Sequence, residues 1–295
     1  MSETAATART RDAGAAVSGR PAAVAMVLAA AGSLQVGAAF AVTLFDDLGP
    51  GGAAFLRLLL AAVVLLALWR PRVRGHSMAD LRIAAAFGLA LGLMNWSIYE
   101  AMDRIPLGVA VTIEFWGPLA VAVVGSRRAL DLLWVALAAL GIVLLASPGG
   151  GGIDAGGVAL ALLAGGCWAA YIGLSARTGQ AFPGGTGLAI AMAVGAVVVL
   201  PAGIAQGGAA LVHPGLLASA LVVALASSVL PYSLELEALR RLPGAVFGVL
   251  MSLEPAVAAL AGLAVLGQAL VPREWAAIAL VVTASAGAAA LGGRR

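Results

Sequence analysis

Long apolar stretches, each about as long as a lipid bilayer is thick, constrain this sequence more than any other feature. A helix of ~20 residues crosses the hydrocarbon core, and the apolar runs predict ten such helices, at residues 21–45, 50–69, 81–101, 106–125, 131–147, 156–176, 186–204, 213–235, 243–266 and 273–291. Hydrophobic residues make up 62% of the 295 residues and charged residues only 11%, against ~25% in soluble domains. We therefore predict an all-α polytopic membrane protein and exclude a water-soluble fold.

The segment 1–20 precedes the first predicted helix and carries Arg9, Arg11, Asp12 and Arg20 among small residues. It is too polar to fold by itself, so we expect a disordered cytoplasmic N-terminus. It resembles a signal peptide only in its charge, and because nine further spans follow, the first span is expected to stay uncleaved.

The arginines are distributed unevenly between the two sides of the predicted membrane. The chain has 17 basic residues, all of them arginine. With a cytoplasmic N-terminus, only Arg104 and Arg273 fall in outer loops, Arg57 falls inside a span, and the other fourteen lie on the cytoplasmic side. This positive-inside pattern predicts that both termini are cytoplasmic, which requires an even number of spans. It also accounts for the net charge of +3 without nucleic acid, a partner that we exclude.

Short sequence matches indicate an internal repeat. The stretch 100–106 (EAMDRIP) recurs at 237–243 (EALRRLP), and a Pro-Gly-Gly triplet occurs at both 50–52 and 183–185. The chain then divides into two units of five spans, residues 21–147 and 156–291. Because five is odd, the two units must enter the membrane from opposite sides. This is the inverted-repeat plan of secondary transporters, whose binding sites lie near the membrane midplane.

Two carboxylates lie at membrane depth beside helix-breaking prolines. Glu114 is followed four residues later by Pro118, which has no N–H for the carbonyl of Glu114. In the second unit, Glu254 lies beside Pro255, which likewise leaves the carbonyl of Met251 free. A buried ionisable group needs a partner or a function. The carboxylates are therefore expected to bind an ammonium group, or alternatively to be protonated or hydrogen-bonded groups that tie helices together.

Other polar side chains within the spans have two open interpretations. Arg57 could meet a substrate carboxylate, although pairing with a protein acid or snorkelling is favoured. The remaining groups are either cavity lining or interhelical hydrogen-bond partners: Gln35, Asn95, Tyr99, Trp168, Tyr171, Ser228, Tyr232 and Glu235.

Several kinds of chemistry are excluded by the residues that the chain lacks at membrane depth. His76 and His213, the only histidines, fall in or beside predicted loops, which argues against a Ser-His hydrolase or a histidine-bound metal. Asp46 and Asp47 have no third ligand nearby in the sequence and are read as a solvated turn rather than a metal site. A single cysteine, Cys167, permits no intrachain disulfide. We expect no cofactor, no metal and no enzymatic activity.

Three motifs resemble those of a known transporter family. They are PLGVAVTIEFWGPLAVA at 106–122 followed by SRR at 126–128, LPYSLE at 230–235, and LMSLEPA at 250–256. They resemble the fourth-, eighth- and ninth-helix motifs of the EamA branch of the drug/metabolite transporter superfamily, and within it are most similar to bacterial threonine/homoserine exporters of the Rht type. The similarity extends through both units, roughly from residue 21 to residue 291.

The resemblance implies an inner-membrane exporter with two EamA repeats and a central cavity shared between them. We expect export of small neutral hydroxylated amino acids by alternating access, with Glu114 binding a proton from outside and the substrate ammonium from inside. The alternative is a broader drug, metabolite or aromatic amino-acid exporter of the same superfamily, and a homodimer is left open. The expected substrate-binding residues are Gln35, Asn95, Tyr99, Glu114, Trp116, Trp168, Tyr171, Ser228, Tyr232, Met251 and Glu254, with Pro118, Pro231 and Pro255 as helix breakers.

Overall fold

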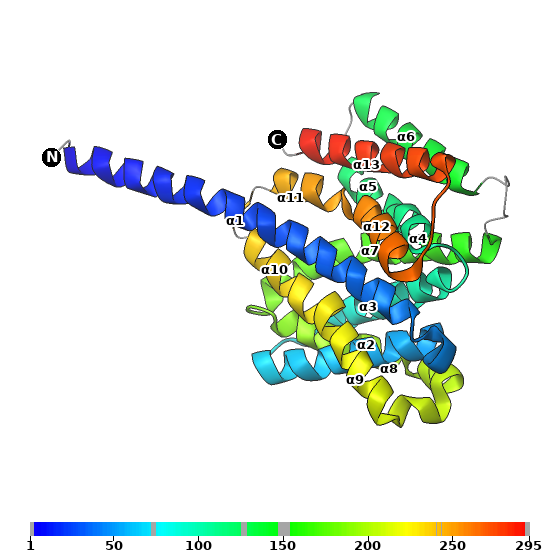
Figure 1. Cartoon of the computed structure of the whole chain (residues 1–295). Coiled ribbons are helices and arrows are strands. Elements are labelled where there is room, and N and C mark those ends of the chain that lie inside the picture. Colours follow the sequence, from blue (N-terminus) through cyan, green and yellow to red (C-terminus); the bar gives the residue numbers. More distant parts are fainter. Residues whose placement is uncertain are drawn as a thin grey trace.

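A computed structural model describes residues 3–71, 75–124, 129–146, 154–239, 241–242 and 244–292. Within these ranges the regular secondary structure is entirely helical, and no strand occurs (Figure 1). The helices of the N-terminal half are α1 (Glu3–Val42), α2 (Phe45–Trp69), α3 (Met78–Met102), α4 (Leu107–Glu114), α5 (Trp116–Val123) and α6 (Ala129–Ala146). The all-α class predicted from the sequence is confirmed.

The C-terminal half continues with helices in each of the remaining predicted spans. These elements are α7 (Ala155–Ala181), α8 (Thr186–Gly207), the short 3₁₀ helix η1 (Gly208–Val212), α9 (Pro214–Ala224), the π-helical segment η2 (Leu225–Val229), α10 (Leu230–Leu239), α11 (Gly244–Met251), α12 (Glu254–Leu266) and α13 (Pro272–Gly292).

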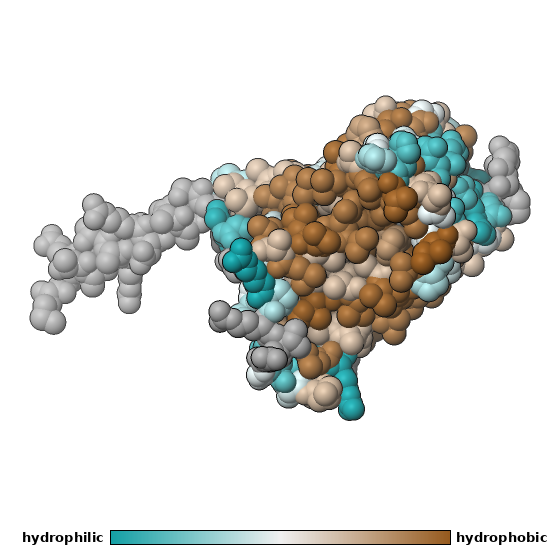
Figure 2. Space-filling view, turned by 90° about the horizontal axis from the view of Figure 1, so that it is seen from below, coloured by the Kyte–Doolittle hydropathy of each residue, from teal (hydrophilic) through white to brown (hydrophobic). Residues whose placement is uncertain are grey.

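Seven helical segments in the described ranges are long and apolar enough to cross a membrane. They are Pro21–Val42, Phe45–Trp69, Met78–Met102, Ala155–Ala181, Thr186–Val212, Pro214–Glu235 and Val246–Leu266, and shorter apolar helices occupy Leu107–Val121 and Leu133–Leu144. Figure 2 shows a broad apolar face bordered by hydrophilic residues. Large side chains such as Phe40, Val63 and Val197 are more than half exposed, as expected for surfaces that contact lipid rather than water.

The first helix begins earlier than the sequence analysis expects. The α1 backbone is helical from Glu3, whereas residues 1–20 were predicted to be disordered. The segment is rich in alanine, the strongest helix former, so local propensity favours continuing the helix even where few apolar side chains occur. The part of α1 that is apolar enough to enter a membrane begins at Pro21.

The two halves pack against each other along most of their length. Helix α2 packs on α8 and α6 on α13, while α3 packs on α7 and α1 packs on α10. Small residues allow these close approaches. The backbone of Gly92 in α3 faces Gly195 in α8, where a Cβ atom on Gly92 would lie 2.9 Å from the Gly195 carbonyl oxygen. Gly108 in α4 similarly faces Ala259 in α12. Glycine and alanine therefore form the helix surfaces that come closest here.

Three of the predicted spans are interrupted near their middle. One span divides into α4 and α5 at Phe115, and another divides into α11 and α12 at Ser252 and Leu253. The third changes from α9 through the π-helical segment η2 into α10. Pro118, Pro231 and Pro255 each lie within four residues after an interruption, as expected of residues that cannot donate a backbone hydrogen bond.

Candidate functional site

A cavity of about 420 Å³ lies between the two halves. Its wall is formed by α1, α2, α3 and the α4–α5 break from the N-terminal half, and by α7, α10, the α11–α12 break and α13 from the C-terminal half. Two of the three interrupted spans thus place their interruptions directly at the cavity. A volume of this size is within the range of small-molecule binding pockets.

The structure brings together most of the side chains that the sequence analysis singled out. The lining includes these predicted residues: Gln35, Asn95, Glu114, Pro118, Trp168, Tyr171, Tyr232, Met251 and Glu254. They come from both halves and from six of the predicted spans, so only the folded chain makes them neighbours.

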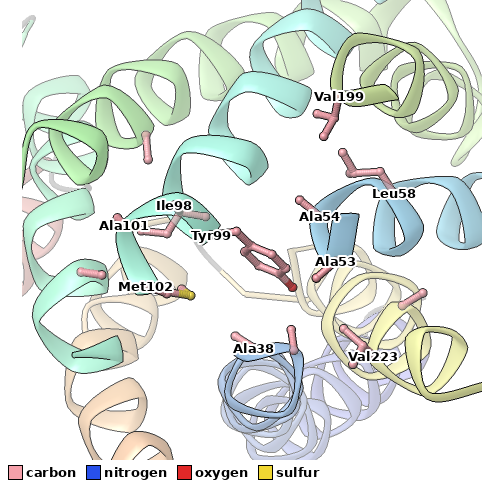
Figure 3. Close-up of a cluster of buried hydrophobic side chains, with 14 of the residues drawn as sticks. Ala38, Ala53, Ala54, Leu58, Ile98, Tyr99, Ala101, Met102, Val199 and Val223 are labelled. Atoms are coloured by element: carbon pink, nitrogen blue, oxygen red, sulfur yellow. The ribbon is translucent and has the colours of Figure 1, made fainter. Parts of the chain in front are cut away.

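Three of the predicted substrate-binding residues do not line the cavity. Tyr99 is fully buried and points between Ala38 and Ala53 of the neighbouring helices (Figure 3). Ser228 is also fully buried, in the π-helical segment η2. Trp116 donates from Nε1 to the carbonyl of Leu162 in α7, at 2.9 Å. Tyr99, Ser228 and Trp116 therefore hold the walls in position rather than face the cavity.

Arg57 lines the cavity and is held by neutral groups rather than by an acid. Its Nε donates to Ser228 Oγ at 3.0 Å, Nη1 donates to the Tyr99 hydroxyl at 3.2 Å, and Nη2 donates to the Ser227 carbonyl at 2.7 Å. The side chain is only 5% exposed, so it does not snorkel toward the membrane surface. The pairing with a protein acid that the sequence analysis favoured is absent from the ion pairs of the described residues.

Three carboxylates face the cavity. Glu114 ends α4, Glu254 begins α12, and Glu235 lies on α10. Glu114 and Glu254 are 7% and 1% exposed. Within the part of the chain that the structure describes, Glu254 Oε1 and Ser285 Oγ, which both belong to lining residues, are buried without a hydrogen-bond partner. Buried polar atoms without a protein partner are available to a ligand or water.

The α4–α5 break is positioned by close packing on α7. A Cβ atom added to Gly165 would lie 2.5 Å from the carbonyl oxygen of Glu114, so only glycine permits this approach. The ring of Phe115 at the break lies edge-on to Trp168 of α7, with 5.1 Å between the ring centroids. Gly165 therefore permits the close approach of α7 to the α4–α5 break.

Some lining residues were not among the predicted site residues. Apolar side chains such as Met94 and Phe247, and small hydroxyls such as Ser175 and Ser285, also face the cavity. In a sequence of apolar spans these residue types are indistinguishable from lipid-facing or packing residues. The π-helical segment η2 likewise has only one sequence signal, Pro231, which follows Ser227 by four residues.

Two glutamines form hydrogen bonds to other segments near the end of α3 and the start of α4. Gln206 of α8 donates to Glu100 Oε1 at 2.7 Å and accepts from the backbone N–H of Gly51 at 2.6 Å. Gln268 accepts from the backbone N–H of Leu107 at 3.0 Å. Under the predicted topology these contacts lie on the outer side of the membrane.

Comparison with known proteins places this arrangement in a family. Residues 155–289 match the EamA-like transporter family. The chain is 42% identical over 267 residues to the threonine/homoserine exporter RhtA of Escherichia coli strain K12, which covers 90% of each chain, and 43% identical over 265 residues to RhtA of Salmonella typhimurium strain LT2, which covers 89% of each. A protein of known crystal structure shares the fold at 19% identity, with a TM-score of 0.62 over 94% of this chain and 99% of that one. The chain therefore belongs to the EamA-like transporter family and is a membrane transporter rather than an enzyme.

Proposed function

We propose that the protein exports small hydroxylated amino acids, threonine and homoserine first among them, across a bacterial inner membrane. The observation that carries the proposal is the cavity between the halves, where the carboxylate of Glu114 and the guanidinium of Arg57 face one small space. A zwitterionic amino acid carries the two complementary charges. The relatives that match nine-tenths of the chain are named threonine/homoserine exporters.

We infer ten spans arranged as two inverted five-helix repeats, residues 21–147 and 156–291. The helix contacts support this symmetry. In the order of the spans, α1 is equivalent to α7, α3 to α10, and the pair α4 and α5 to the pair α11 and α12. Exchanging the repeats therefore turns the α3–α7 contact into the α10–α1 contact. The same exchange turns the contacts of α7 with α4 and α5 into those of α1 with α11 and α12. The pairs α2–α8 and α6–α13 are self-equivalent under the same exchange.

The proposed transport cycle is alternating access between two such repeats. With both termini in the cytoplasm, the bonds of Gln206 and Gln268 lie outside the cavity and separate it from the outer surface. Pro118, Phe247 and Ser285 of the lining lie on the cytoplasmic halves of their spans. This arrangement supports a state that loads substrate from the cytoplasm.

Glu114 is the proposed group that couples export to the proton gradient. It is buried at the end of α4 and faces the cavity. A carboxylate in this position binds the substrate ammonium from inside, and takes up a proton after the substrate leaves on the outer side. The uncharged carboxyl then returns through the membrane at lower cost than the ion.

A broader exporter of aromatic or drug-like compounds is the second candidate. The observation that favours it is the aromatic lining, in which Phe115, Trp168 and Phe247 offer flat apolar surfaces. The two candidates differ in the range of compounds that they export. An exporter of this second kind confers resistance to many unrelated compounds, whereas an amino-acid exporter does not.

The test is efflux of labelled threonine and homoserine from preloaded cells that lack their own exporters. The comparison is between wild type, Glu114→Gln, the empty vector and Glu274→Gln. Glu274 is a matched control because it lies outside the cavity lining, where it accepts from the Val271 backbone N–H at 2.9 Å at the start of α13. We expect efflux in wild type and Glu274→Gln that collapses when the proton gradient is removed, and none in Glu114→Gln despite normal membrane insertion.

Two outcomes would count against the proposal. Unchanged efflux in Glu114→Gln removes the proposed coupling role. No efflux from well-inserted wild type withdraws the threonine and homoserine assignment and makes a wider metabolite screen the next step.

A further inference from the structure

Arg57 is the only basic residue among the described side chains that line the cavity. It lies on α2 and is 5% exposed, in a wall that otherwise offers carboxylates, hydroxyls, amides and apolar groups. A buried guanidinium is costly unless a negative charge or a complete set of acceptors compensates it. Its hydrogen bonds therefore decide whether the site is complete without a ligand.

The hydrogen bonds of Arg57 leave part of its donor capacity unused. A guanidinium has five N–H groups, one on Nε and two on each Nη. The described contacts use one N–H on each nitrogen, toward Ser228 Oγ, the Tyr99 hydroxyl and the Ser227 carbonyl. One N–H on Nη1 and one on Nη2 remain. Two N–H groups on the terminal nitrogens can donate to the two oxygens of one carboxylate.

The interruption of the eighth predicted span positions the guanidinium. Pro231 follows Ser227 by four residues and has no N–H to donate to the Ser227 carbonyl. The chain passes through the π-helical segment η2, and the free carbonyl accepts from Arg57 instead. Tyr99, whose ring centroid lies 5.4 Å from the guanidinium carbon, fixes the other side. Arg57 is therefore held in place before a ligand binds, which reduces the entropy lost on binding.

We propose that Arg57 is the residue that binds the α-carboxylate of the exported amino acid. This inference rests on the proposed function and makes it more specific. Arg57 takes the carboxylate and Glu114 takes the ammonium, so the cavity recognises the two charges that every α-amino acid shares. Amino alcohols and amines that lack the carboxylate leave the two N–H groups unpaired and bind more weakly.

The experiment measures binding of matched ligand pairs to purified full-length protein. Each pair is an amino acid and the amino alcohol made by reducing its carboxylate: threonine and threoninol, homoserine and its alcohol, serine and serinol, leucine and leucinol. The proteins are wild type, Arg57→Gln, Arg57→Lys and Arg177→Gln. Arg177 is the matched control because it lies exposed on α7, outside the cavity lining.

We expect wild type and Arg177→Gln to bind threonine at least about tenfold more tightly than threoninol, as one charge-assisted hydrogen-bonded pair predicts. In Arg57→Gln the ratio falls to about one, because threonine binding weakens while threoninol binding changes little. If Arg57 had only a structural role, Arg57→Gln would weaken the binding of threonine and threoninol equally, and the ratio of their affinities would not change. Arg57→Lys keeps the buried charge but offers no planar fork, so the ratio falls there as well.

The outcomes separate this inference from the proposed function. If wild type binds neither threonine nor homoserine, the proposed function fails, and the serine and leucine pairs decide the role of Arg57. The inference is supported if wild type prefers the amino acid over the amino alcohol in any pair and Arg57→Gln abolishes that preference. A ratio that persists in Arg57→Gln overturns it, and so does the absence of preference in every wild-type pair. If Arg57→Gln does not fold, an unchanged ratio in Arg57→Lys overturns it equally.

Discussion

Gln206 Nε2 at the end of α8 donates to Glu100 Oε1 near the end of α3, over a distance of 2.7 Å. The same carboxylate oxygen accepts from Trp96 Nε1 at 3.1 Å, and Gln206 Oε1 accepts from the backbone N–H of Gly51 in α2. One glutamine thus links helices from both halves of the bundle. A conformational change that opens this side of the cavity has to break these bonds.

Replacing Gln206 by leucine should make the outer side open more readily. The variant Gln206→Leu keeps the side-chain size but loses the hydrogen bond to the Glu100 carboxylate, so opening should become about tenfold more favourable. Opening is measured with the substitution Met102→Cys in a Cys167→Ser background, because Met102 lines the cavity and ends α3. We expect a membrane-impermeant thiol reagent added outside to label it faster in Gln206→Leu.

The control for this experiment is Gln180→Leu, which makes the same change at an exposed position on α7. Its labelling rate should match that of the protein with wild-type glutamines. Equal rates in Gln206→Leu and Gln180→Leu would show that the Gln206 bonds do not hold the outer side closed.

Substitution by alanine should lower stability at Gly165 but not at Gly166. A Cβ atom on Gly165 would meet the Glu114 carbonyl at 2.5 Å, whereas on Gly166 the nearest atom is Trp116 Cζ2, at an ordinary 3.6 Å. Gly165→Ala should lower the free energy of unfolding by about 1–3 kcal/mol through overpacking and should impair threonine efflux. Thermal unfolding and efflux assays of both variants check this, and a Gly165→Ala protein as stable and active as Gly166→Ala would contradict it.

Replacing Pro231 by alanine should weaken substrate binding without destabilising the fold. Alanine supplies an N–H that competes with Arg57 Nη2 for the Ser227 carbonyl and favours an ordinary α-helix over the π-helical segment η2. We expect threonine affinity to fall several-fold while the unfolding temperature does not drop. Pro201→Ala, at an exposed position in α8, is the control and should leave affinity unchanged. Wild-type affinity in Pro231→Ala would mean that Arg57 does not depend on this interruption.

Glu254→Gln distinguishes the two roles that the sequence left open for Glu254. Its Oε1 is buried at the cavity without a partner in the described part of the chain, which favours binding an ammonium group over tying α12 to its neighbouring helices. We expect efflux to fall at least tenfold with an unchanged unfolding temperature, while the Glu274→Gln control, which lies outside the cavity lining, behaves as wild type. A variant that loses stability and efflux together would instead indicate that Glu254 orients the helix.

The all-helical class and the candidate spans could be predicted from the sequence because the bilayer imposes one length and one composition on every span. A run of ~20 apolar residues is a local property that needs no knowledge of the neighbouring helices. The interruptions could be anticipated for a similar reason, since a proline removes a hydrogen bond wherever it occurs. In the N-terminal segment the α1 backbone is helical from Glu3, where an alanine-rich sequence favours helix although few apolar side chains occur.

The candidate site could be predicted only in part. Glu114 and Glu254 were identifiable because ionised groups are costly at membrane depth. The same argument identified Arg57 but not its partners, since Ser227, Ser228 and Tyr99 come from two other spans. Tyr99 and Ser228 were expected at the cavity and instead lie behind Arg57, because a polar residue in a span signals burial but not the direction in which it points.

The sequence by itself therefore determined which segments can enter a membrane, where their helices break, and which few charges need a function. These are consequences of local hydrophobicity, proline chemistry and the cost of burying charge. Only the tertiary structure decided which polar groups face one cavity, that neutral acceptors hold Arg57 while its described contacts leave two N–H groups unused, and that Gln206 links α8 to α3 and α2. Those features depend on contacts between residues far apart in the chain, which follow from how small-residue helix surfaces pack together and not from any single span.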